Sequence, residues 1–217
     1  MEAIAATSRT ASIFLGGELC TTPAPQPRSF IIAADSGYDH ALAQGFAVDF
    51  LIGDLDSISD HGLAHAERND VTIERHDSDK DETDLELAML KAVARGSRRI
   101  DLFGGEAGRL DHLLGIASAL TDRRFSDIDI VWHTCTGQVR PISDGGTIEV
   151  DVAIGTTVSL VAMSDTTGVS TSGMTWALSG ATLARGTSRG LRNTTNARPA
   201  SVSVDTGALL VIVEGTT

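Results

Sequence analysis

The chain has 217 residues, of which 41% are hydrophobic and 4% aromatic, and its formal net charge at pH 7 is −12. This hydrophobic content can fill a core, which excludes disorder over most of the length, and the length suits two small domains. The negative charge argues against nucleic acid and anionic membranes as partners, because both bind proteins through Lys and Arg.

Cys20 and Cys135 are the only cysteines. They are too few and too far apart for a zinc cluster, and their number is typical of a reducing compartment, so we expect free thiols. Residues Met1 to Thr10 lack a signal-peptide pattern, and no stretch approaches the ~18 apolar residues of a membrane span. We therefore expect a cytoplasmic protein.

From about Ala11 to about Trp132, short apolar runs alternate with helical patterns. The runs are Ser12 to Leu15, Ser29 to Ala34, Phe50 to Ile52, Val71 to Ile73, Ile100 to Phe103 and Ile128 to Trp132. Strands that alternate with helices in this way predict an α/β domain with a mainly parallel sheet.

The helix that follows Asp84 is the best defined of these patterns. Thr83 and Glu86 form a capping box, and apolar residues then repeat at helical spacing before Gly96. These residues are Leu85, Ala88, Met89, Ala92 and Val93. The pattern places Asp81 and Asp84 just before or within the first helical turn.

Past about Gly137 the sequence becomes rich in Thr, Ser, Gly and Val, with short alternating runs and no clear helix. The runs are Thr147 to Val152, Thr157 to Met163 and Ala208 to Val213. They predict an all-β domain of hairpins. Gly137 to Gly146, with Pro141 and an Asp-Gly-Gly turn, is the expected joint, so we predict domains at residues 1–138 and 139–217.

Acidic residues follow the strand predicted at Phe50 to Ile52. If the chain stays extended, Asp54 and Asp56 point to the same side. Two carboxylates at the carboxyl end of a strand can bind Mg²⁺, with substrate phosphates completing its ligands. A solvated turn in which the aspartates cap the next segment is the alternative.

The segment Asp77 to Asp84 carries five acidic groups in eight positions. Repulsion within it must be offset by water, a cation or helix capping. Taken alone, the segment is most often a charged helix entrance, but a second acidic pair after another strand favours a cation.

A third motif follows the strand that ends at Phe103. Gly104 and Gly105 permit close approach of the backbone to an anion, Arg109 can hold a phosphate oxygen, and Asp111 can hold a metal. The alternative is a tight turn in which Arg109 pairs with Asp111 or Glu106. In the all-β half, Trp176 offers an aromatic face to a cation or, alternatively, packs in a hairpin.

Taken in chain order, six motifs resemble those of the thiamine pyrophosphokinase family, and together they span almost the entire chain. They are Ala34-Asp35-Ser36-Gly37, Gly53-Asp54-Leu55-Asp56-Ser57, Asp79-Lys80-Asp81-Glu82-Thr83-Asp84, Gly108-Arg109-Leu110-Asp111-His112, Gly173-Met174-Thr175-Trp176 and Gly190-Leu191-Arg192-Asn193.

The resemblance implies an α/β nucleotide- and Mg-binding catalytic domain followed by a β-sandwich domain for thiamine binding and dimerisation. It implies a homodimer with thiamine sites between subunits, in which ATP donates a diphosphoryl group to the thiamine hydroxyl and leaves as AMP. By the same resemblance, the catalytic and magnesium-binding acids are Asp54, Asp56 and Asp81. The ATP region would include Asp35, Thr83, Asp84, Arg109 and Asp111, and the thiamine contacts Trp176 and Asn193.

Three positions depart from the family pattern. Ser36 stands where a second Gly is usual, Lys80 where many members have Gln, and Arg192 where a Ser usually precedes the Asn. A cation at Arg192 is unfavourable beside cationic thiamine unless it points away or pairs with an acid. Two other functions stay open: another Mg-dependent phosphotransferase or phosphohydrolase on the same scaffold, and a non-catalytic thiamine or nucleotide sensor.

Overall fold

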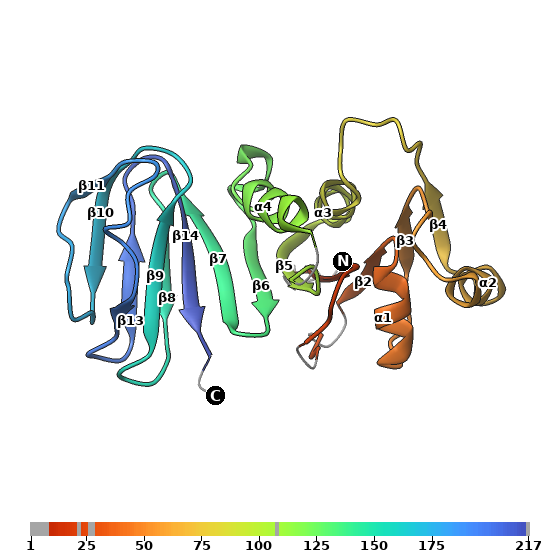
Figure 1. Cartoon of the computed structure of the whole chain (residues 1–217), viewed down its shortest axis with the longest axis horizontal. Helices are drawn as coiled ribbons and strands as arrows, with labels where there is room; N and C mark the ends of the chain where they lie inside the picture. The colour runs from red at the N-terminus through yellow and green to blue at the C-terminus, as the bar shows by residue number, and fades with distance from the viewer. Residues whose placement is uncertain (1–8, 21–22, 26–28, 107–108, 216–217) are drawn as a thin grey trace, which may run out of the picture. The chain divides into compact units, whose positions relative to one another are not determined.

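A computed structural model describes residues 9–20, 23–25, 29–106 and 109–215 (Figure 1). The chain forms two compact units, one of Met1–Ile116 with Ile128–Cys135 and one of Ala117–Asp127 with Thr136–Thr217. The first unit is α/β and the second is rich in strands, which confirms the predicted fold class. The domain boundary at residue 138 stays a prediction.

The first unit is built on six parallel strands, one at each predicted apolar run. They are β1 (Arg9–Phe14), β2 (Phe30–Ala34), β3 (Phe50–Gly53), β4 (Thr72–Arg75), β5 (Ser97–Phe103) and β6 (Asp129–Thr134). Their order is β6-β5-β1-β2-β3-β4. The chain therefore runs outward from β1 to β4 and returns to β5 on the other side of β1, which creates a switch point where open α/β sheets bind ligands.

Helices connect the strands. They are α1 (Gly37–Ala43), α2 (Asp60–Arg68), α3 (Asp84–Ala94) and α4 (Leu110–Ala119), followed by the 3₁₀ turn η1 (Arg123–Phe125). Figure 1 shows α1 and α3 on opposite sides of the strands, which explains why every residue of β3 is buried. The capping box is confirmed, since Thr83 Oγ1 accepts from Glu86 N and the Glu86 carboxylate accepts from Thr83 N.

The second unit contains a sandwich of two antiparallel sheets (Figure 1). Its strands are β7 (Gly137–Ser143), β8 (Thr147–Val150), β9 (Thr157–Ala162), β10 (Thr166–Ser172), β11 (Ala181–Leu183), β12 (Asn193–Thr194), β13 (Ala200–Ser203) and β14 (Ala208–Glu214). One sheet has the order β12-β9-β14-β7 and the other β11-β10-β13-β8. Alternate residues of both sheets, such as Leu160, Val211 and Val202, fill the core between them.

The segment predicted as the joint, Gly137 to Gly146, is mostly strand, and its role as the joint between domains stays a prediction. Gly137–Ser143 is strand β7, which pairs with β14, and only the Asp144-Gly145-Gly146 turn signal lies outside a strand. Pro141 lies within β7, opposite Leu210 of β14, since proline, although rare in strands, is tolerated where its missing N–H is not needed.

The prediction of free thiols is also wrong, because Cys20 and Cys135 form a disulfide. The two Cα atoms lie 5.1 Å apart although 115 residues separate them in sequence. Cys20 follows β1 and Cys135 follows β6, so both leave the carboxyl edge of the same parallel sheet.

Among the described helices, none is both long and apolar enough to cross a membrane.

Candidate active site

A pocket of about 600 Å³ opens at the switch point of the first unit. Its walls come from the segments that follow β1, β2 and β5, the loop before α3, and the start of α4. All five residues predicted to form the ATP region line it, namely Asp35, Thr83, Asp84, Arg109 and Asp111. The structure thus brings together side chains that are far apart in sequence.

Three carboxylates gather beside this pocket. Oxygens of Asp35, Asp54 and Asp84 all lie within 4.8 Å of one another. Asp35 Oδ1 and Asp84 Oδ1 are buried and accept no hydrogen bond from the described residues, although Lys80 Nζ lies 3.1 Å from Asp84 Oδ1 as an ion-pair partner. Oxygens in this arrangement fit a divalent cation, which accepts carboxylate ligands and offsets their repulsion.

The pKa values of Asp35 and Asp54 shift in opposite directions. Burial raises the pKa of Asp35, and the negative charges of Asp84, Asp56 and Asp54 add to this despite a hydrogen bond from Ser57 Oγ at 2.6 Å. Burial also acts to raise the pKa of Asp54, but hydrogen bonds from Ser78 and the Asp56 amide, with the charge of Lys80, hold that pKa below its usual value. The site therefore contains one carboxyl that resists ionisation and one that favours it.

Local backbone conformation explains how the acids meet. Gly53 has φ of 150°, and a Cβ there would lie 3.2 Å from Asp84 Cγ and 3.3 Å from Asp35 Cβ, so a side chain would crowd both. Asp35 and Leu55 have positive φ of 49° and 64°. For a bulky residue such as Leu55 this conformation is strained, which is a common property of functional turns.

The expectation that the chain stays extended after β3 is wrong. The strand ends at Gly53, Leu55 turns the chain, and the Asp56 amide donates to Asp54 Oδ1 at 3.3 Å. Asp54 joins the trio, whereas Asp56 is exposed and contributes its charge nearby. The alternation rule failed because it holds only for continuous strand geometry.

The segment before α3 divides into residues that line the pocket and residues that do not. Asp84 is the first residue of α3, and Lys80 Nζ lies 3.1 Å from its Oδ1. Asp81 is exposed and does not line the pocket, and Asp77 and Asp79 are exposed as well. Asp81 as a catalytic and metal-binding residue stays a prediction.

The third motif is held by an ion pair. Arg109 donates to Asp111 through Nε at 3.1 Å and Nη2 at 2.6 Å, which is the pairing that the sequence left open as an alternative. This guanidinium lowers the pKa of Asp111 to about 2. Gly105 N donates to Gly16 O at 2.9 Å, which joins the turns after β5 and β1, while Gly108 lies outside the described residues.

The two predicted thiamine contacts lie side by side in the second unit. Trp176 has 63% of its surface exposed, whereas Asn193 is buried. Asn193 Oδ1 accepts from Trp176 N at 3.0 Å, and its Nδ2 donates to Trp176 O at 2.7 Å. Asn193 therefore holds the backbone that presents the exposed indole, a positioning role that the sequence did not reveal.

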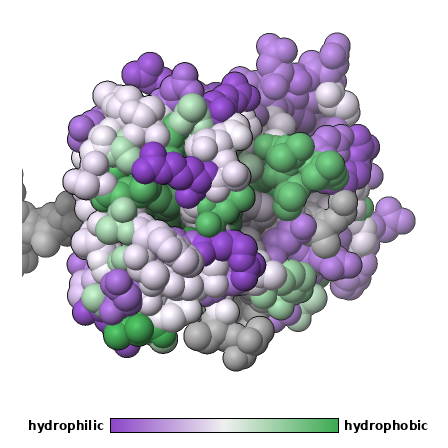
Figure 2. Space-filling model, turned by 60° about the vertical axis from the view of Figure 1, so that its left-hand side comes forward, coloured by the Kyte–Doolittle hydropathy of each residue, from purple (hydrophilic) through white to green (hydrophobic). Residues whose placement is uncertain are grey.

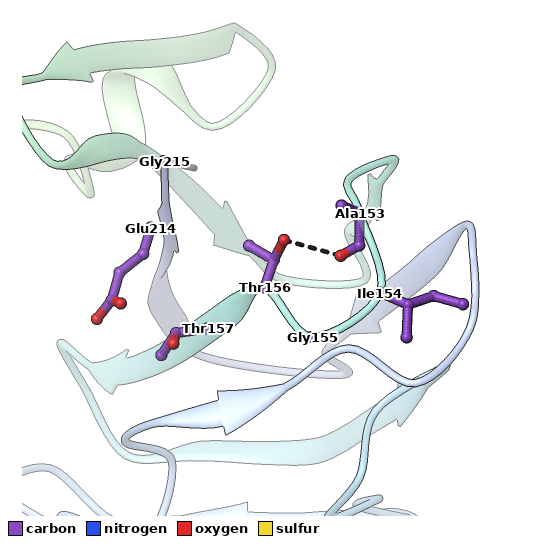
Figure 3. A pocket seen from close by; sticks show the side chains of 7 residues that line it. All are labelled: Ala153, Ile154, Gly155, Thr156, Thr157, Glu214 and Gly215. Atoms are coloured by element: carbon purple, nitrogen blue, oxygen red, sulfur yellow. Dashed lines mark hydrogen bonds between the residues drawn. The ribbon is translucent and has the colours of Figure 1, made fainter. Parts of the chain in front are cut away.

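Arg192 precedes this asparagine, with φ of 57° and a guanidinium 4.0 Å from Glu214. The acid offsets the unfavourable cation noted in the sequence. Glu214 also borders a smaller pocket of about 310 Å³ at the loop 153–157, where Thr156 Oγ1 donates to Ala153 O at 2.8 Å (Figure 3). Among the described residues that line this second pocket, only Glu214 has a titratable side chain.

Both halves of the chain match sequence models of one family. The model "Thiamin pyrophosphokinase, catalytic domain" matches residues 25–132, and "Thiamin pyrophosphokinase, vitamin B1 binding domain" matches residues 146–209. The chain belongs to the thiamin pyrophosphokinase family. The family resemblance drawn from the six motifs is thereby confirmed.

Individual relatives agree with this assignment. A thiamine pyrophosphokinase of Bacillus subtilis is 33% identical over 84 residues, a segment that spans 39% of each chain. Crystal structures of thiamine pyrophosphokinases from B. subtilis and Geobacillus thermodenitrificans have TM-scores of 0.85 and 0.83, with 21% and 24% identity. Both matches cover 96% of this chain. They cover 100% of the B. subtilis chain and 98% of the G. thermodenitrificans chain. The crystal structure of a yeast thiamin pyrophosphokinase has a TM-score of 0.76 at 16% identity. This match covers 97% of this chain and 87% of the yeast chain.

Sequence reasoning missed several polar residues of the pocket, notably Ser57, Ser78 and Glu82. Ser57 is the last residue of the Gly53-Asp54-Leu55-Asp56-Ser57 motif, and its hydrogen bond to Asp35 links two motifs. The signal was present in the motif itself, but serines are common in turns and the bond joins residues 22 positions apart.

Proposed function

We propose that the chain is an ATP:thiamine diphosphotransferase, which converts thiamine to thiamine diphosphate and releases AMP. One observation carries the proposal: three carboxylates and two cationic side chains, Lys80 and Arg109, border a pocket at the switch point of the parallel sheet. Acids with adjacent cations suit a metal–triphosphate ligand, and the chain belongs to a family named for this reaction.

Asp35, Asp54 and Asp84 are the residues that would hold Mg²⁺. When bound, Mg²⁺ supplies charge neutralisation at the transferred phosphoryl groups. Asp56 adds negative charge beside them, and we keep Asp56 and Asp81 as candidates for the catalytic set. Their contribution is tested by substitution rather than inferred from position.

The other pocket residues bind and orient ATP. The exposed Arg109 guanidinium can exchange Asp111 for a phosphate, because both acceptors suit its paired donors. Thr83 fixes the start of α3, and the glycine turns after β1 and β5 let the backbone approach the nucleotide. These contacts hold the triphosphate so that its β-phosphorus is accessible to an alcohol.

In the transfer, the hydroxyl oxygen of thiamine forms a bond to the β-phosphorus and the bond from that phosphorus to the α-phosphate oxygen breaks, so AMP leaves. The hydroxyl proton passes to a carboxylate or to solvent, but an aspartate of ordinary pKa is a weak base. Most of the catalysis therefore comes from positioning and electrostatics. Trp176 presents a π face to the thiamine cation.

The test is incubation with ATP, Mg²⁺ and thiamine, followed by mass measurement of both products. We expect equal amounts of AMP and thiamine diphosphate. ADP or inorganic phosphate as the principal product would assign the site to a different phosphotransferase or hydrolase. Binding of both ligands without turnover would make the chain a sensor.

We also propose a homodimer. Large apolar side chains are exposed on the second unit, including Ile154, Trp176 and Leu191, and Figure 2 shows apolar patches bordered by hydrophilic ones. Light scattering coupled to size-exclusion chromatography tests the oligomeric state.

We also propose a cytoplasmic location. The two cysteines do not support this location, because they form a disulfide.

A further inference from the structure

The acidic trio already has a cation of the protein's own beside it. Lys80 Nζ lies 3.1 Å from Asp84 Oδ1, and oxygens of Asp35 and Asp54 lie within 4.8 Å of an oxygen of the same Asp84 carboxylate. Lys80 therefore pairs directly with one acid of the trio and brings a positive charge close to the other two.

Lys80 is held more firmly than a typical surface lysine. Only 16% of its side chain is exposed, whereas lysines normally extend into solvent. It lies in the loop before α3 and pairs with the first residue of that helix, so the pair connects loop to helix. A long side chain confined in this way loses rotamer freedom, which the attraction to the acids must offset.

The ammonium group and a divalent cation would compete for the same oxygen. Asp84 Oδ1 is buried, and its nearest cationic group among the described residues is Lys80 Nζ. Mg²⁺ binds carboxylate oxygens at about 2.0–2.1 Å, so an ion on Asp84 Oδ1 would lie very close to this ammonium. Repulsion between two cations at such separation is strong in a partly buried site.

Lys80 also lines the pocket, so its ammonium group can reach a second partner there. An ammonium displaced from Asp84 can turn to the phosphate groups of a ligand without leaving the site, since lysine is a flexible point charge. The ammonium group thus has carboxylates as partners within the protein and a phosphate as a partner that arrives with the ligand.

We propose that Lys80 is a positioning residue that serves as an internal counter-cation. It neutralises Asp84 and Asp54 in the ligand-free protein, weakens the binding of divalent metal there, and moves to phosphate when metal and nucleotide enter together. The third step rests on the proposed function, whereas the first two do not. Metal binding thereby depends on the nucleotide.

The test is a titration of ligand-free protein with Mn²⁺, followed by electron paramagnetic resonance. Lys80→Met keeps the length of the side chain and removes its charge, so we expect Mn²⁺ to bind roughly tenfold tighter or more. Lys80→Arg should bind Mn²⁺ as the unmodified chain does. Equal affinity in Lys80→Met and the unmodified chain would overturn the proposal.

The chain offers a matched control in Lys91, its only other lysine. Lys91 pairs with Glu74, lies 4.8 Å from the Phe50 ring centroid and does not line the pocket. Lys91→Met should leave Mn²⁺ affinity unchanged. A gain in affinity as large as that of Lys80→Met would mean that net charge alone sets the affinity, and would overturn the proposal.

Thermal unfolding in EDTA gives a second readout. Lys80→Met should unfold at a lower temperature than the unmodified chain, and Mg²⁺ should raise its Tm by more. If Lys80→Met does not fold, Lys80→Gln takes its place in both measurements with the same expectations. Because the titration contains neither ATP nor thiamine, it remains decisive even if the product assay fails.

Discussion

Asn193 gives the sharpest prediction about how the second unit presents Trp176. Asn193→Ala removes three hydrogen bonds, two with the Trp176 backbone and one from Thr194 N at 2.9 Å. Each such bond contributes about 0.5–1.5 kcal/mol net, so the loss of three should lower the free energy of unfolding by about 1.5–4.5 kcal/mol. Urea denaturation measures this difference directly.

The same substitution should make the Trp176 indole more mobile, because its backbone loses two hydrogen bonds. Trp132, the only other tryptophan, is buried and donates to Gly104 O at 2.9 Å, so a change in fluorescence quenching by acrylamide reports chiefly on Trp176. We expect faster quenching in Asn193→Ala and a higher thiamine KM with little change in kcat. Asn196→Ala, at an exposed position nearby, is the matched control and should change stability by about 0.5 kcal/mol at most.

Two outcomes would refute the reasoning. Unchanged stability and unchanged quenching in Asn193→Ala would show that the amide does not hold Trp176. A large loss of kcat with normal stability would instead return Asn193 to the role of a direct substrate contact.

The other predictions concern the first unit. Reduction of the Cys20–Cys135 disulfide, or replacement of both cysteines by serine, should lower the free energy of unfolding by about 2–4 kcal/mol. The chain-entropy model sets an upper limit of about 5 kcal/mol for a loop of this length. If a reductant destabilised the double variant as much as the unmodified chain, the prediction would be wrong. Because burial raises the pKa of Asp35, the folded state binds this proton more tightly than the unfolded chain, so the ionised form destabilises above the folded pKa. Asp35→Asn should therefore stabilise the EDTA-treated protein at pH 7 and lose this advantage as the pH falls through the raised pKa to below the ordinary carboxyl pKa of 3.8. Urea denaturation curves that show the same gain at pH 7 and below pH 3.8 would disprove the burial argument. Asp84→Asn should reduce turnover more than Asp81→Asn, because only Asp84 joins the trio and lines the pocket; the opposite order would place Asp81 in the catalytic set.

The sequence predicted those parts of the fold that depend on local pattern. Six apolar runs became the six strands of the first unit, and the Thr83–Glu86 capping box marked the start of α3 to the residue. Strand pattern and capping are determined within a few residues, so they can be recognised without tertiary contacts.

The failures involve contacts between distant residues or unusual backbone conformations. The positive φ of Leu55 leaves no mark on hydropathy, yet it ends the extended conformation after β3, and only Asp54 of the acidic pair joins the trio. The family resemblance named Asn193 as a thiamine contact, which stays a prediction, but its bonds to Trp176 depend on pairing across 17 positions. The meeting of Cys20 and Cys135 likewise depends on strand order.

The disulfide makes a covalent ring of residues 20–135, from which the rest of the chain extends as two tails. Asp35, Asp54 and Asp84 lie on the ring, whereas Trp176 and Asn193 lie on the C-terminal tail. One hydrolytic cut of the backbone within the ring would add the mass of one water, and the two fragments would separate only after reduction. The residues proposed to handle phosphate are thus linked to one another by two covalent paths, and those proposed to recognise thiamine are connected to them by one.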